Sequence, residues 1–176
     1  MGIAEASPER AVIIAAAKRL LDGARAQGVP VISVRIAFAP GHATVAANSE
    51  IWRRVVASQA MTDGTWGAEF YDGLGPLAGE IVVTHRRNDA FYESPLADIV
   101  ARFQPRRLVI AGVSTTYVVE STVRRASDMG YEVVVAADAC SSASRDMHAA
   151  SLKAMALLAD IWTVDEIVAE FARSRP

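Results

Sequence analysis

This sequence is poor in cysteine and has no long apolar run. Its 176 residues include one cysteine, Cys140, so an intrachain disulfide and a zinc site built on several cysteines are both excluded. No apolar run reaches the ~18 residues of a membrane-spanning helix. No charged segment precedes an apolar core in the manner of a secretory leader. We therefore expect a cytoplasmic protein that does not bind a membrane.

Net charge is also nearly absent. The chain carries 18 basic and 20 acidic residues, which gives a formal charge of -2. Such a small charge produces no field that would attract nucleic acid or anionic lipid. Two basic pairs, Arg86-Arg87 and Arg106-Arg107, are therefore interpreted as short solvated faces, and we expect no nucleic-acid partner.

Histidine is scarce as well, and the spacing of the three histidines argues against a metal site. His42, His85 and His148 lie far apart, and no two of them have the i, i+4 spacing that places ligands on one helix face. We therefore expect no metal and no other cofactor. His42 lies in a Pro-Gly turn, where we expect it to face solvent.

What the sequence does contain is an ordinary globular composition, 52% hydrophobic and 22% charged, which predicts a single domain over residues 1–176. Apolar periodicity predicts strands and helices in alternation, as in a three-layer α/β/α fold with a mostly parallel, doubly wound sheet. The predicted helices cover residues 8–27, 49–57, 94–104, 145–159 and 165–173, and the strands cover residues 29–38, 81–84, 108–113, 132–137 and 161–164. In the helix over 145–159 we expect Met147, Leu152, Met155, Ala156 and Ala159 to face inward.

Residues 108–130 are the centre of this pattern. The apolar run 108–113 has the length and composition of a strand buried on both faces, and Ser114, Thr115 and Thr116 follow where a helix N-cap is needed. Gly130 then ends the predicted helix. Because ligands bind beyond the carboxyl ends of parallel strands, the turn between strand and helix is the candidate binding centre.

Five segments in order resemble the isochorismatase-like superfamily of hydrolases, which includes nicotinamidases, carbamoylsarcosine amidases and isochorismatase. The resemblance covers roughly residues 8–168 and rests on GTWGAEF (64–70), GEIVVTHRRNDAFYESPL (79–96), GVSTTYVVEST (112–122), RRASDMGYEVVVAADACSS (124–142) and HAASLKAMALLADIWTVDEIV (148–168). It implies the same three-layer fold. It also implies a cis peptide bond between Val113 and Ser114, with the N–H groups of Tyr117 or Val118 facing the substrate.

Three positions depart from the family's catalytic pattern. The family's cysteine nucleophile matches Val118, which has no nucleophilic atom, and its lysine matches His85. The family's aspartate ends a first strand for which residues 1–7 are too few and too polar, so we predict that no acid there, Glu5 included, contacts His85. His85 is then either a replacement acid–base catalyst or a remnant, since its ordinary pKa of about 6.5 allows both duties near neutrality.

Two functional hypotheses remain open. The first is a divergent hydrolase or lyase acting on a small carboxylate or carbonyl metabolite without a cysteine nucleophile, with His85 as the catalytic residue. Its substrate-binding residues would be Arg35, Trp66, Phe91, Ser114, Thr115, Tyr117 and Val118, although a structural role for Trp66 stays open. The second is a catalytically inactive family member that binds a small molecule or serves as a structural subunit.

Two further residues invite a catalytic interpretation, for which we prefer a structural one. Cys140 has no neighbouring cation in the sequence to activate it and is predicted to be a small buried residue. Asp138, at the end of a strand, is predicted to be a structural hydrogen bonder. The missing first strand should leave a sheet edge uncovered, so we expect a homo-oligomer, a dimer or a tetramer.

Overall fold

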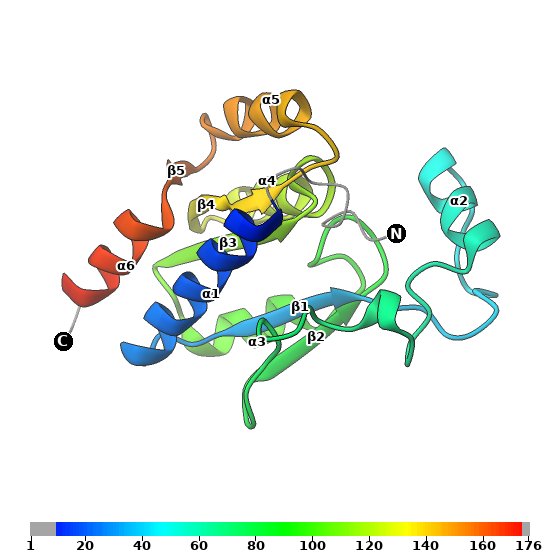
Figure 1. Ribbon diagram of the computed structural model, residues 1–176, viewed down its shortest axis with the longest axis horizontal. Coiled ribbons are helices and arrows are strands. Elements are labelled where there is room, and N and C mark those ends of the chain that lie inside the picture. Colours follow the sequence, from blue (N-terminus) through cyan, green and yellow to red (C-terminus); the bar gives the residue numbers. More distant parts are fainter. Residues whose placement is uncertain (1–9, 174–176) are drawn as a thin grey trace.

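The computed structural model describes residues 10–173 (Figure 1). Strands and helices alternate along the chain, as predicted. The elements are α1 Arg10–Ala26, β1 Ile32–Ile36, α2 Glu50–Ser58, β2 Ile81–His85, α3 Leu96–Phe103, β3 Arg107–Val113, α4 Glu120–Asp128, β4 Glu132–Ser141, α5 Arg145–Met155, β5 Asp160–Trp162 and α6 Val164–Arg173. The prediction that the first helix begins at residue 8 and the prediction for Glu5 concern residues outside this described range.

Two short helical turns complete the elements. A 3₁₀ turn, Trp66–Ala68, lies in the long connection between α2 and β2. A π-helical turn, Thr115–Val119, follows β3 and leads directly into α4. Gly130 ends α4 with a φ of 89°, a left-handed conformation that glycine adopts at little cost, so the predicted role of Gly130 is confirmed. No helix within residues 10–173 is long and apolar enough to cross a membrane.

The end of α5 differs from the prediction. The helix ends at Met155, and the Leu158 N–H then bonds to the Met155 carbonyl three residues back, which tightens the chain into a turn before β5. Met155 is buried as expected. Met147 and Ala156, which were expected to face inward, are exposed.

The fold class is confirmed: all strand pairs are parallel, and helices cover both faces. The five strands form two sheets, however, with β1 beside β2 and with the order β3-β4-β5 in the second sheet. In the second sheet Val109 of β3 lies opposite Val134 of β4.

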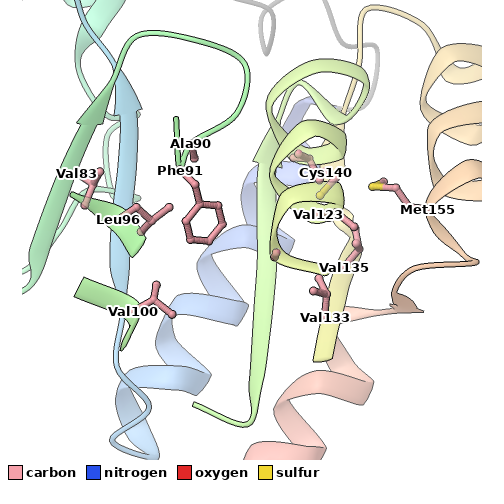
Figure 2. Packing of buried hydrophobic residues seen from close by; sticks show 12 residues of the cluster. Val83, Ala90, Phe91, Leu96, Val100, Val123, Val133, Val135, Cys140 and Met155 are labelled. Atoms are coloured by element: carbon pink, nitrogen blue, oxygen red, sulfur yellow. The ribbon is translucent and has the colours of Figure 1, made fainter. Parts of the chain in front are cut away.

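Two apolar clusters hold the layers together. On one face, α3, α4 and α5 supply Leu96, Val123 and Met155 to a cluster that includes Val83 of β2 and Val135 of β4. Figure 2 shows the ring of Phe91 between Val83, Leu96 and Val100 on one side and Val123 and Val133 on the other. This face of the core is therefore shared by the two sheets.

The opposite face is covered by α1 and α6. Ala16 of α1 and Ile167 of α6 pack with Val134 and Ala136 of β4. Near the end of α1, the Arg25 guanidinium donates two hydrogen bonds to the Glu80 carboxylate, 2.8 and 2.9 Å long, just before β2 begins. Since α1 packs against β4, this ion pair joins the two sheets on the second face.

Between the sheets, two strand edges have no strand partner among residues 10–173: the edge of β1 away from β2 and the edge of β3 away from β4. In Figure 2, β1 lies on the side of β2 that faces β3. None of the seven residues of β3 is fully buried, although this apolar strand was predicted to be buried on both faces. Within the part of the chain that the structure describes, an edge without a strand partner thus lies on each side of one gap.

Candidate active site

The carboxyl ends of β2, β3 and β4 carry the polar groups of the candidate site. His85 is the last residue of β2, Ser114 follows β3, and Ser142 follows β4. Because parallel strands end at the same edge of their sheet, Ser114 and Ser142 lie together at the edge of the three-stranded sheet where ligands bind in α/β folds, while His85 ends a strand of the two-stranded sheet.

His85 is held in one tautomer. Its side chain is 2% exposed, and its Nδ1–H donates to the Arg87 carbonyl oxygen over 2.7 Å. A carbonyl can only accept, so Nδ1 carries the proton and Nε2 keeps its lone pair when the ring is neutral. Burial lowers the pKa of His85 below its ordinary 6.5, against smaller opposing effects of the Arg87 carbonyl and Asp89. His85 is therefore neutral at pH 7 and suited to accept a proton at Nε2.

The turn after β3 has the predicted backbone feature: the Val113-Ser114 peptide bond is cis. The N–H groups of Tyr117 and Val119 both donate to the Ser114 carbonyl, each over 3.2 Å. The Tyr117 N–H, one of the two predicted donors to a substrate, is thus already bonded within the turn, and the role of the Val118 N–H stays a prediction.

Ser142 is the centre of a hydroxyl network that fixes this turn. Its Oγ lies 2.6 Å from Thr116 Oγ1 and 3.3 Å from Ser114 Oγ, and it accepts the Thr116 N–H over 3.1 Å. Thr115, with 0% exposure, contacts Nδ1 of His148 on α5 through its hydroxyl over 2.8 Å. Ser114 and Thr115 are therefore tied to β4 and α5.

Val118, at the position of the family's nucleophile, is partly buried and packs against the apolar cluster around Val123. Its side chain contributes contact surface only. Among residues 10–173, no hydrogen bond joins His85 to the turn 114–118.

The other predicted substrate-binding residues lie in three different environments. Phe91 is buried in the shared core, and Trp66 is 66% exposed on its 3₁₀ turn. Arg35 ties together the loop that follows α2: it donates to Asp63 over 2.9 Å and, over 3.3 Å each, to the Ala68 carbonyl and the Thr84 hydroxyl. Phe91 thus has a packing role and Arg35 a bridging role. The side chains of Phe91, Trp66 and Arg35 do not line one common hollow.

Cys140 and Asp138 have the structural roles predicted for them. Cys140 is buried, and burial raises the pKa of its thiol to about 12, so the nucleophilic thiolate is absent at neutral pH. Asp138 Oδ1 accepts the Val164 N–H over 2.8 Å at the first residue of α6.

The prediction for His42 was wrong. Its side chain is 2% exposed, packs on Phe38 with ring centroids 5.1 Å apart, and donates from Nε2 to the Ala60 carbonyl over 2.7 Å. The Pro-Gly turn folds inward because Phe38 and Trp52 form a separate apolar cluster beneath it. Within the part of the chain that the structure describes, no three His, Cys, Asp or Glu side chains gather as metal ligands would.

Two hollows flank the strand ends. One, of about 260 Å³, lies between the start of α1 and the start of α5, and its lining includes Ser142 and His148. The other, of about 400 Å³, follows β2 and is lined by Asn48, Trp52, Arg87, Asn88, Asp89, Tyr92 and Ser121. Sequence reasoning did not assign Ser142, His148 or Arg87 to the site. The only available signal was the position of Ser142 and Arg87 just after strand ends.

Comparison with known proteins agrees with this architecture. The sequence matches the Isochorismatase domain family over residues 1–166. YecD of Escherichia coli O157:H7, an uncharacterized isochorismatase family protein, is 30% identical over 149 residues, which cover 82% of this chain and 75% of that protein. Ureidoacrylate amidohydrolase RutB of Methylobacterium radiotolerans is 29% identical over 153 residues, which cover 80% of this chain and 59% of the enzyme. This chain thus spans less than two thirds of RutB.

Solved structures give the same fold. A cysteine hydrolase from Pseudomonas syringae pv. phaseolicola superimposes with a TM-score of 0.87 at 19% identity, over 96% of this chain and 84% of that chain. An isochorismatase family protein from Burkholderia thailandensis superimposes with a TM-score of 0.81 at 25% identity, over 93% of this chain and 84% of that chain. With the family match over residues 1–166, these findings show that the chain belongs to the isochorismatase family of hydrolases.

Proposed function

We propose that this chain hydrolyses a carbonyl–nitrogen bond in a small carboxylic acid without a cysteine nucleophile, using His85 as the acid–base catalyst. The observation that carries the proposal is the fixed, neutral tautomer of His85 at the end of β2. Relatives named ureidoacrylate amidohydrolase make a ureido acid the first substrate to test.

In the proposed reaction, His85 Nε2 takes a proton from water while the water oxygen forms a bond to the substrate carbonyl carbon. The Val118 N–H is the candidate donor to the oxyanion that develops. Nε2–H⁺ then returns the proton to the leaving nitrogen as the carbon–nitrogen bond breaks. Val118 has no nucleophilic atom and the Cys140 thiol is buried, so direct attack by water is the route these residues support.

Release of ammonia and carbon dioxide from ureidoacrylate tests this proposal. We expect the wild type to turn over and His85→Gln to lower kcat/KM by about 10²–10⁴-fold, the usual contribution of a general acid–base residue. His42→Gln is the matched control, because it also replaces a buried histidine that donates to a backbone carbonyl. Equal loss of activity in the two variants, with both folded, would contradict the role of His85.

A second candidate function, a catalytically inactive binding protein, is favoured by the contacts of the turn. The Tyr117 N–H is bonded to the Ser114 carbonyl, and no described hydrogen bond connects His85 to the turn. The same assay separates the two functions: no turnover by the wild type on a panel of ureido, amide and vinyl-ether acids, together with measurable binding of one of them, would favour the second.

A further inference from the structure

We infer that the hollow after β2 is a carboxylate-binding site, with the Arg87 guanidinium as its anion receptor. This inference rests on the proposed function only for the class of small acid that we expect there. The hollow lies between α2, the loop after β2 and α4, and it measures about 400 Å³, a size suited to a small metabolite.

Arg87 is held in place without a carboxylate partner. Its guanidinium lies 4.9 Å from the centroid of the buried Trp52 ring, and it donates one hydrogen bond to the Ala46 carbonyl over 3.3 Å. Among residues 10–173, no Asp or Glu oxygen lies within the 4.0 Å that defines an ion pair with it. Arg25, Arg35 and Arg107, by contrast, are paired with acids.

This combination is what a receptor for an exogenous carboxylate requires. Stacking on an aromatic face fixes the plane of a guanidinium, and a fixed plane loses little freedom when it binds a carboxylate through two parallel hydrogen bonds. Trp52 itself is fixed by an edge contact with Phe38, with ring centroids 6.1 Å apart. The receptor therefore exists before any ligand binds.

The rest of the lining defines the other end of the ligand. Asp89 lines the same hollow, and its Oδ1 accepts the Phe91 N–H over 2.8 Å, which fixes the carboxylate. Asn48, Asn88 and Ser121 add amide and hydroxyl groups. The carboxylate of a ligand would bind the Arg87 guanidinium, and an N–H group of the same ligand would donate to the Asp89 carboxylate. An amido or ureido acid carries both groups, so it fits better than a dicarboxylate, whose second carboxylate would face Asp89.

Arg87 also connects this hollow to His85, because its backbone carbonyl is the acceptor for His85 Nδ1–H. One residue thus positions the proposed base through its main chain and would receive the ligand through its side chain. Replacing the side chain leaves the carbonyl in place, so binding can be changed without removing the partner of His85.

The test measures binding without turnover. The probe is β-methanesulfonamidopropanoate, which has a carboxylate and an N–H but no carbonyl group on the nitrogen to hydrolyse. The matched neutral ligand is N-(3-hydroxypropyl)methanesulfonamide, in which an alcohol replaces the carboxylate. Binding is followed by calorimetry and by the indole ¹⁵N–¹H signals of Trp52, Trp66 and Trp162, assigned with Trp→Phe variants. We expect the acid to bind and to shift the Trp52 signal alone, and the alcohol to bind about tenfold or more weakly.

Arg87→Gln should weaken binding of the acid by about tenfold or more, and Arg87→Lys, which keeps the charge but not the planar fork, should weaken it less. Arg54→Gln, on the exposed face of α2, is the control and should bind as the wild type does. Equal affinity for the acid and the neutral alcohol, or an unchanged affinity in Arg87→Gln, would overturn the inference. A saturable shift of Trp52 in a protein without turnover would support this site while contradicting the proposed function.

Discussion

β3 and β4 are neighbouring parallel strands of similar apolar composition, but their burial differs. Val133 to Ala136 of β4 are all buried, and Val134 is 0% exposed, whereas no residue of β3 is fully buried. Among residues 10–173, β4 has a strand on each side, whereas β3 has a strand partner on one side. The comparison teaches that an apolar run predicts a strand, while the number of its neighbours decides how deeply that strand is buried.

The largest expected effect compares the two strands directly. Val134→Ala should lower the free energy of unfolding by about 2 kcal/mol, because two methyl groups are lost from a closed site. Val109→Ala, opposite it in the same pairing and on the same face, should cost about half of that or less, since its site is already partly open. Urea unfolding of both variants measures the difference, and equal losses would contradict the comparison.

A smaller effect is expected at the ion pair between the sheets. The Arg25 guanidinium holds the pKa of Glu80 at about 2, well below its usual range. A lowered carboxyl pKa stabilises the fold above pH 4.5, and this contribution disappears as the pH falls from 4.5 toward 2. Glu80→Gln should lower the urea midpoint at pH 7 and weaken its dependence on pH in that window.

Lys18→Gln is the control for this pair, because it breaks an exposed i, i+4 pair with Asp22 on α1 while keeping the Asp22 charge that acts on Arg25. Its urea midpoint should stay close to that of the wild type at both pH values. A Glu80→Gln variant with an unchanged midpoint and an unchanged pH dependence would show that the pair does not connect the sheets energetically.

The third prediction concerns the buried histidine of the two-stranded sheet. Because burial lowers the pKa of His85, the unfolded chain binds a proton at this residue before the folded chain does. Stability should therefore fall as the pH drops below about 6.5 and toward the lower pKa of the folded protein. His85→Gln should lose this dependence, which urea midpoints between neutral and mildly acidic pH will measure.

The smallest effect is expected at the buried thiol of the three-stranded sheet. Cys140 should react slowly with iodoacetamide in the folded protein and rapidly in urea, since burial raises its pKa to about 12. Cys140→Ser should leave kcat/KM within about tenfold, a change of about 1.4 kcal/mol in the barrier. Complete loss of turnover in a folded Cys140→Ser variant would identify the thiol as a nucleophile.

The sequence predicted most of the elements, because their signals are local. Apolar runs marked all five strands, and Gly130 marked the end of a helix. It did not predict that α5 ends at Met155, because no helix-breaking residue follows and the tighter turn there is made by a backbone hydrogen bond from Leu158. The position of the gap between β1 and β3 also depends on pairing, which local patterns do not specify.

For the site, the sequence identified the positions at strand ends but not their partners. His85 and Ser114 were found because they follow apolar strands. The contact of Thr115 with His148 spans 33 residues and depends on how α5 packs, so no local signal predicted it. His42 was placed in solvent because it lies in a Pro-Gly turn, whereas the cluster beneath it combines Phe38 with Trp52 and Val55 further along the chain.

The pH dependence of kcat/KM for ureidoacrylate tests the central claim most directly. A neutral His85 that accepts a proton predicts a rate that rises with pH through an apparent pKa below 6.5 and is level at neutral and alkaline pH. A rate that keeps rising into the alkaline range where a thiol ionises, or a His85→Gln variant with the wild-type value, would contradict it.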